Sequence, residues 1–159
     1  MNVGILGLGL IGGSLARAYS MEGHRVLCYD RDQKMLSFSI LAGAVESPLT
    51  TENLGECDLV LLAIYPEGSA AWLEENGSFI RKDALVMDCC GIKREICSRC
   101  FPLAEKYGFT FVDLYSPLYD VAIGEVYEGY TIDGGHFTEK GYQVVTAQIT
   151  PVLEQLLGR

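Results

Sequence analysis

Three glycines near the start of the chain have the spacing that a phosphate-binding loop needs. Gly7, Gly9 and Gly12 form a Gly-x-Gly-x-x-Gly motif that follows a short apolar segment. The first glycine permits a tight turn, the second lets a pyrophosphate approach the backbone, and the third allows a helix to pack closely on a strand. The backbone N–H groups of Leu10, Ile11 and Gly12 would be donors at the helix start, where the helix dipole adds positive potential. These residues predict a pyrophosphate site.

A carboxylate and a guanidinium follow the next apolar segment, at residues 25–29. Asp30 is expected to accept hydrogen bonds from the ribose hydroxyls of an adenosine, and its charge repels a 2′-phosphate. Arg31, next to it, weakens that preference. Strand, glycine loop, helix, second strand and terminal acid together make a dinucleotide fingerprint. We therefore expect NAD as the cofactor and NADP as the less favoured one; a glycine-rich turn that binds nothing is the alternative.

Composition and charge narrow the class of protein. The chain has 159 residues, enough for one domain with a substantial core, and its net charge of −9 argues against nucleic acid and anionic membranes as partners. The apolar opening lacks a basic region and is broken by glycines, which predicts neither a signal peptide nor a membrane span. We expect a cytoplasmic protein with six reduced cysteines. Cys97 and Cys100 have C-x-x-C spacing on a predicted helix, where packing is the expected role, and no metal site is predicted.

Alternating strands and helices must position the glycine loop. Strands are expected at residues 2–6, 25–29, 44–46, 58–64, 84–88 and 109–112, and helices at 10–22, 31–41, up to 75 after Pro66, 93–107 and from Thr138, with Pro151 kinking or dividing the last one. This alternation predicts an α/β fold, a three-layer α/β/α sandwich with a doubly wound, mostly parallel, Rossmann-like sheet in the order 3-2-1-4-5-6. We expect residues 1–159 to form a single domain, with a change of character after Val112 and an irregular segment at 115–129.

The first part of the chain, residues 1–112, resembles the nucleotide-binding half of prephenate and arogenate dehydrogenases. The resemblance rests on residues 7–16, on Tyr29-Asp30-Arg31 and on residues 86–93. It implies binding of NAD or NADP. In that family the strand matching residues 109–112 leads into a Gly-Gly-His-Pro stretch with the catalytic histidine, where this chain reads Asp113-Leu114-Tyr115-Ser116. Without that histidine, and without the family's helical substrate domain, the resemblance implies an incomplete dehydrogenase.

The rear of the chain, residues 113–159, resembles the end of SGNH (GDSL-type) hydrolases. The match is residues 111–115 and the string at 133–142. In that family an Asp-x-x-His pair supplies two members of a Ser-His-Asp triad, so the resemblance implies His136 as general base and Asp133 as its orienting carboxylate. Ser14 stands in a Gly-Gly-Ser-Leu string that looks like the family's nucleophile block, but it falls about one turn into a helix. A Gly-x-Asn-Asp block for the oxyanion hole is not found, so this centre is incomplete too.

Two resemblances that meet at one strand predict an engineered or recombined chimera, with a natural divergent protein as the alternative. Three interpretations stay open. The chain is a NAD-preferring dinucleotide-binding module without catalysis, or an esterase or acyl hydrolase that uses Ser14, His136 and Asp133. The third is an engineered protein that tests whether parts of two folds can be joined and has no function of its own. Apolar surface that the helical substrate domain covers in the dehydrogenase family would be exposed in this chain, and it would favour a homodimer.

Overall fold

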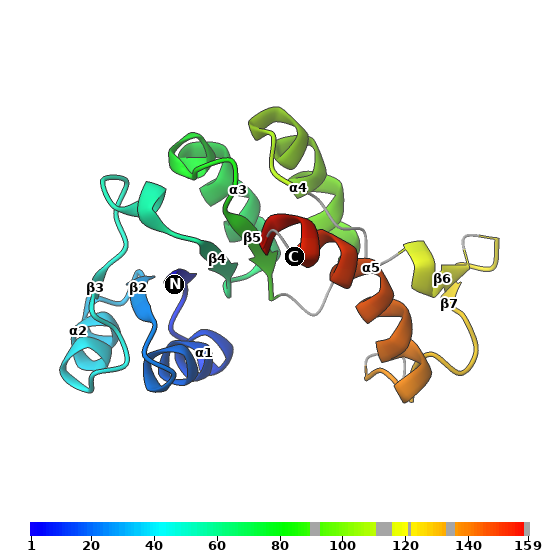
Figure 1. The fold of residues 1–159 in the computed structure, drawn as a ribbon, viewed down its shortest axis with the longest axis horizontal. Helices are drawn as coiled ribbons and strands as arrows, with labels where there is room; N and C mark the ends of the chain where they lie inside the picture. Colours follow the sequence, from blue (N-terminus) through cyan, green and yellow to red (C-terminus); the bar gives the residue numbers. More distant parts are fainter. Residues whose placement is uncertain (90–92, 111–115, 121, 133–135, 158–159) are drawn as a thin grey trace. The chain divides into compact units, whose positions relative to one another are not determined.

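The computed structural model of the chain describes residues 1–89, 93–110, 116–120, 122–132 and 136–157 (Figure 1). The chain divides into two compact units, Met1–Thr110 and Phe111–Arg159. The division falls close to Val112, where the composition changes. That the whole chain forms a single domain stays a prediction.

A five-stranded parallel sheet forms the centre of the first unit. Its strands are β1 (Asn2–Leu6), β2 (Arg25–Tyr29), β3 (Ser47–Pro48), β4 (Leu59–Leu62) and β5 (Leu85–Asp88). They lie in the order β3-β2-β1-β4-β5, and every neighbouring pair is parallel. The order is the doubly wound one, so the predicted Rossmann-like α/β fold is confirmed.

Four helices cover the two faces of this sheet: α1 (Leu10–Met21), α2 (Gln33–Leu41), α3 (Pro66–Asn76) and α4 (Lys93–Tyr107). Successive residues of a strand point to opposite faces. Val3 and Ile5 of β1 therefore pack with Ala16 of α1 and Leu36 of α2 in one buried cluster. Leu6, on the other face, belongs to the cluster that contains residues of α3 and α4. These are the three predicted layers, with α1 and α2 on one side and α3 and α4 on the other.

The predicted elements differ from the observed ones mainly at their ends. The helix expected at 31–41 begins at Gln33, because the Asp32 side chain accepts hydrogen bonds from Lys34 N and Met35 N and so caps it. The strand expected at 44–46 is instead β3, a two-residue pairing of Ser47 with Leu27 and of its neighbour with Cys28. Phe109 and Thr110 are not in a strand, and residues 111–112 of that expected strand lie outside the described residues.

A hydrogen bond and an ion pair to one carboxylate join the amino ends of β1 and β4. Asp58, before β4, accepts a hydrogen bond from Asn2 N at 2.6 Å and one from Arg81 at 2.7 Å. The hydrogen bond from Asn2 and the Arg81 charge lower the pKa of the Asp58 carboxyl below its ordinary value. One half-buried carboxylate thus connects β1, β4 and the loop before β5.

The second unit contains a hairpin and a long helix. A short 3₁₀ turn, η3 (Ser116–Leu118), leads into β6 (Tyr119–Asp120), which pairs antiparallel with β7 (Glu125–Val126) in the segment expected to be irregular. Thr138 Oγ1 accepts a hydrogen bond from Gly141 N at 3.2 Å, which confirms the predicted start of the helix α5 (Glu139–Leu157). The helix continues past Pro151, so it is not divided there; the ring removes one backbone donor but the turns on both sides persist.

Candidate functional site

The glycine loop fits tightly between its neighbouring strands. It connects β1 to α1, and Gly7 has φ +88°, a conformation that glycine adopts without strain. Gly7 N donates to Tyr29 O at 2.7 Å, on the β2 side. On the β4 side, a Cβ added at Gly7 would lie 2.6 Å from both Ala63 O and Ile64 Cγ2. The space around the first glycine is therefore filled by protein.

The other two glycines face different surroundings. A Cβ at Gly12 would collide with Gly7 O, so the first turn of α1 packs directly on the loop. A Cβ at Gly9 would meet nothing within 4 Å. Gly9 is the N-cap of α1 with extended backbone, and no side chain caps the helix. Open space thus lies beside backbone donors without side-chain acceptors, which suits an anionic group such as a pyrophosphate.

Asp30 is fixed next to this loop. Its Oδ2 accepts a hydrogen bond from Leu8 N at 2.6 Å, and its Oδ1 accepts one from Asp32 N at 2.8 Å. Each carboxylate oxygen can accept a further bond, so two ribose hydroxyls could still be bound. Arg31, the other charged residue predicted here, is exposed. The structure therefore brings Asp30 and the glycine loop together at the carboxyl edge of the sheet.

The predicted hydrolytic residues are described only in part. Ser14 Oγ donates to Leu10 O of its own helix at 2.6 Å. His136 is exposed, and its carbonyl oxygen accepts a hydrogen bond from Ile132 N at 2.8 Å. Asp133 lies outside the described residues, so the pairing of Asp133 with His136 stays a prediction.

Cys28 and Cys57 are buried free thiols. Cys97 and Cys100 lie on α4, and burial raises the pKa of Cys100 to about 11. Such a thiol stays protonated at neutral pH, as expected for a packing role. Within the described ranges, no group of three or more His, Cys, Asp or Glu side chains could hold a metal ion. The helices described there include none long and apolar enough to cross a bilayer.

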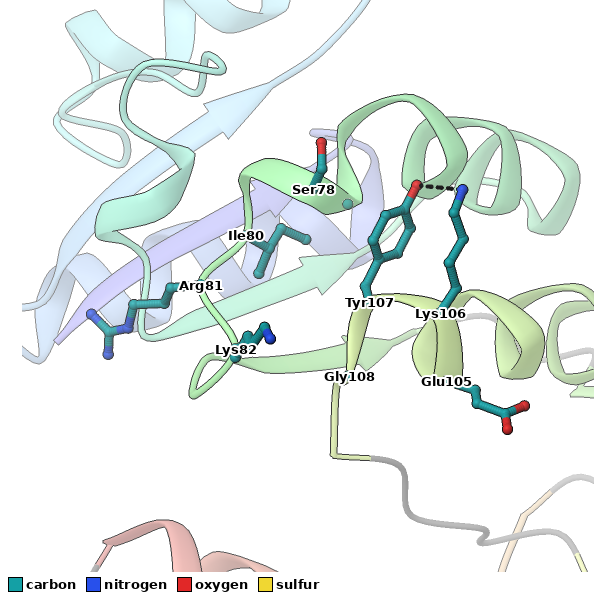
Figure 2. Close-up of a pocket in the computed structure, with 9 residues that line it drawn as sticks. Ser78, Ile80, Arg81, Lys82, Glu105, Lys106, Tyr107 and Gly108 are labelled. Carbon is teal, nitrogen blue, oxygen red and sulfur yellow. Dashed lines mark hydrogen bonds between the residues drawn. The ribbon is translucent and has the colours of Figure 1, made fainter.

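A pocket of about 580 Å³ lies at the opposite edge of the sheet and was not predicted from the sequence (Figure 2). Residues within 77–82 and 105–108 line it, from the segment before β5 and the end of α4. Lys106 Nζ donates to the Tyr107 hydroxyl at 3.2 Å, and Arg81 is paired with Asp58 and Asp83. Because Arg81 and Lys106 already have partners and the pocket is far along the strands from the glycine loop, we assign the candidate site to the loop.

Sheet order, loop and terminal acid are those of a Rossmann domain for dinucleotides. Residues 2–114 match the family model of the NAD-binding domain of 6-phosphogluconate dehydrogenase, and the chain belongs to this family. The family supports a nicotinamide dinucleotide as the cofactor. No curated protein matches the chain.

Solved structures agree with the dehydrogenase resemblance. Arogenate dehydrogenase of Synechocystis is 25% identical with a TM-score of 0.61, over 65% of this chain and 37% of that one. Prephenate dehydrogenase of A. aeolicus, in complex with hydroxyphenyl propionate and NAD+, is 22% identical with a TM-score of 0.54, over 68% and 38%. Another structure of the Aquifex aeolicus enzyme is 19% identical with a TM-score of 0.53, over 94% of this chain and 58% of that one. The chain thus spans less than two thirds of the length of each.

Proposed function

We propose that the first unit, Met1–Thr110, binds NAD at the glycine loop and prefers it to NADP. The observation that carries this proposal is the hydrogen bond from Leu8 N to Asp30 Oδ2 at 2.6 Å, because it holds a carboxylate beside the uncapped start of α1. The N–H groups of Leu10, Ile11 and Gly12 would donate to the pyrophosphate, and Asp30 would accept hydrogen bonds from the adenosine ribose. When bound, the cofactor supplies hydride-transfer chemistry through its nicotinamide ring.

Selection between the two cofactors depends on charge. The Asp30 carboxylate repels the 2′-phosphate of NADP, while the exposed Arg31 attracts it. Asp30 is held by two backbone N–H groups, whereas Arg31 is exposed to solvent. Solvent screens the charge of the exposed guanidinium, so the fixed carboxylate has the larger effect and favours NAD.

Titration of the chain with NADH and NADPH tests this proposal. We expect NADH to bind the wild type more tightly, and Asp30→Asn, which removes the charge but keeps an acceptor for Leu8 N, to reduce the NADH preference about 10-fold. Asp32→Asn is the matched control, because Asp32 caps α2 two residues away and is not assigned to the ribose. Equal NADH and NADPH affinities in the wild type would contradict the preference, and absence of binding would contradict the site.

We also infer that the described part of the first unit binds the cofactor without completing a dehydrogenation. The chain has two histidines, His24 and His136. His24 precedes β2 and lies within 3.3 Å of the Met1 amino group, at the amino edge of the sheet and away from the loop. The first unit therefore offers no histidine base beside the cofactor. A prephenate dehydrogenase assay that showed turnover would overturn this inference.

A hydrolase remains the second candidate, on the string at residues 133–142. Thr138, two residues after His136, caps α5, which begins at Glu139. Against it, Ser14 Oγ is hydrogen-bonded within α1, and the likeness to the Aquifex aeolicus dehydrogenase covers 94% of the chain, which extends well past Val112. Hydrolysis of nitrophenyl acetate that disappears in both Ser14→Ala and His136→Ala would support the hydrolase, and with it the chimera. Equal rates in the variants would indicate background thiol chemistry.

A further inference from the structure

Tyr65 is an aromatic side chain that the fold presents to solvent at the carboxyl edge of the sheet. Its side chain is 86% exposed. It is the N-cap residue of α3 and lies three residues after the end of β4 at Leu62. A single exposed aromatic residue needs no explanation by itself. The place of Tyr65 in the chain, next to the residues that pack against the glycine loop, suggests a role in binding at that loop.

The segment before Tyr65 packs against the loop. Ala63 N donates to Leu6 O at 2.9 Å, which continues the pairing of β4 with β1 beyond the strand ends. Gly7 lies so close to Ala63 and Ile64 that a Cβ on it would collide with both. Tyr65 is the next residue along, so its ring starts from the backbone that borders the loop.

The sheet order then decides which half of a dinucleotide reaches this residue. β1 lies between β2 and β4. Asp30 follows β2, so an adenosine ribose bound by Asp30 lies on the β2 side of the loop. The pyrophosphate at the loop joins two nucleosides, and the second one must leave on the opposite side. That side is the exit of β4, at Ala63 and Tyr65.

We propose that Tyr65 is a cofactor-binding residue whose ring packs against the nicotinamide riboside half of the bound cofactor. This inference rests on the proposed NAD site and adds to it a contact for the reactive half. The oxidised nicotinamide ring carries a positive charge, and the face of a phenol ring attracts cations. Tyr65 therefore stabilises NAD+ more than NADH, while ADP-ribose, which has no nicotinamide, gains little from the ring.

Titrations with NAD+, NADH and ADP-ribose test the role of the ring. We expect Tyr65→Leu to weaken NAD+ about 3- to 10-fold, to weaken NADH less, and to leave ADP-ribose within about 2-fold of the wild type. Tyr65→Phe keeps the aromatic face and is expected to bind all three ligands like the wild type. Phe79→Leu is the matched control: Phe79 is 49% exposed but lies in the 3₁₀ turn η2 (Gly77–Phe79) at the amino edge, and its substitution should change no affinity.

The same titrations distinguish failure of the Tyr65 role from failure of the proposed dinucleotide site. If Tyr65→Leu binds NAD+ like the wild type, or weakens ADP-ribose as much as NAD+, the role of Tyr65 is refuted while the dinucleotide site stands. If the wild type binds neither ADP-ribose nor NAD+, the proposed function fails and this inference fails with it. Thermal melting of each variant, followed through the single tryptophan Trp72 on α3, shows that a lost affinity does not come from lost folding.

Discussion

At the scale of single residues, the three glycines of the loop have separable roles. Gly7 turns the chain with a positive φ, Gly12 brings α1 against the loop, and Gly9 borders open space. Added methyl groups would therefore act on folding at one position and on ligand binding at another.

Gly9→Ala and Gly12→Ala form a matched pair that tests this separation. We expect Gly9→Ala to keep the free energy of unfolding within about 1 kcal/mol of the wild type, because its Cβ meets nothing, and to lose NADH affinity, because the methyl group occupies the pyrophosphate space. Gly12→Ala should destabilise the fold by about 1–3 kcal/mol through the collision with Gly7 O. Urea denaturation and NADH titration measure both quantities; equal effects of the two substitutions would contradict the assignment.

Buried thiols provide a second prediction at this scale. Burial raises the pKa of Cys28 to about 12 and that of Cys57 to about 11, so neither is a thiolate at pH 8 in the folded chain. We expect both to resist alkylation until the first unit unfolds, and their labelling rates to rise with urea in step with unfolding. Peptide mapping by mass spectrometry after pulse labelling identifies each site. Rapid labelling of Cys28 in native buffer would show that the structure around β2 opens locally without global unfolding.

At the scale of elements, the amino ends of β1 and β4 are joined to the loop before β5 by Asp58. The folded-state pKa of this carboxyl lies below its ordinary value, so its contribution to stability is present above the unfolded pKa of about 4 and is lost as pH falls through the lower, folded pKa. The side chain is 38% exposed, so solvent screening reduces the contribution.

Asp58→Asn should therefore lower the free energy of unfolding at pH 7 by about 1 kcal/mol and make the curve of stability against pH flatter below about pH 4. Urea denaturation at pH 7 and at pH 3 measures both effects. Asp83→Asn is the control, since Asp83 also pairs with Arg81 but is 74% exposed and should matter less. An unchanged pH dependence in Asp58→Asn would contradict the role of this carboxylate.

The elements also show what the sequence could and could not predict. α4 and β2 were predicted with their observed bounds, because long periodic helices and compact apolar strands carry their own signal. β3 was misplaced by a few residues, because two residues have no pattern and only pairing with β2 defines them. The glycine loop and Asp30 were found through spacing along the chain. Tyr65 and the pocket at the amino edge were missed, because exposure and convergence of distant segments are properties of the folded chain.

At the scale of the whole molecule, both buried clusters of the first unit are built from residues before Thr110. A unit with its own core can fold alone. If residues 1–159 form a single domain, the core of the first unit should depend on residues 111–159. A first unit that folds without those residues would argue against the single domain.

Shortening the chain to Met1–Thr110 tests this independence. We expect the shortened chain to melt cooperatively and to bind NADH within about 3-fold of the full chain, since the loop and Asp30 lie inside this unit. Calorimetry and NADH titration are the measurements. A shortened chain that fails to fold would show that the first unit needs residues 111–159 to fold, as the single-domain prediction requires.

The hydrogen bond from Leu8 N to Asp30 limits which substitutions could change the cofactor preference, either by engineering or in evolution. The carboxylate to which we assign the discrimination against NADP also accepts the hydrogen bond from Leu8 N and so holds the loop that we propose binds the cofactor. Replacing Asp30 by a small apolar or a basic residue would reduce the discrimination against NADP. The same replacement would also remove the acceptor of Leu8 N and so weaken cofactor binding by the loop. A change of preference to NADP therefore needs a first exchange to Asn, which keeps an acceptor for Leu8 N, before a cation is added nearby.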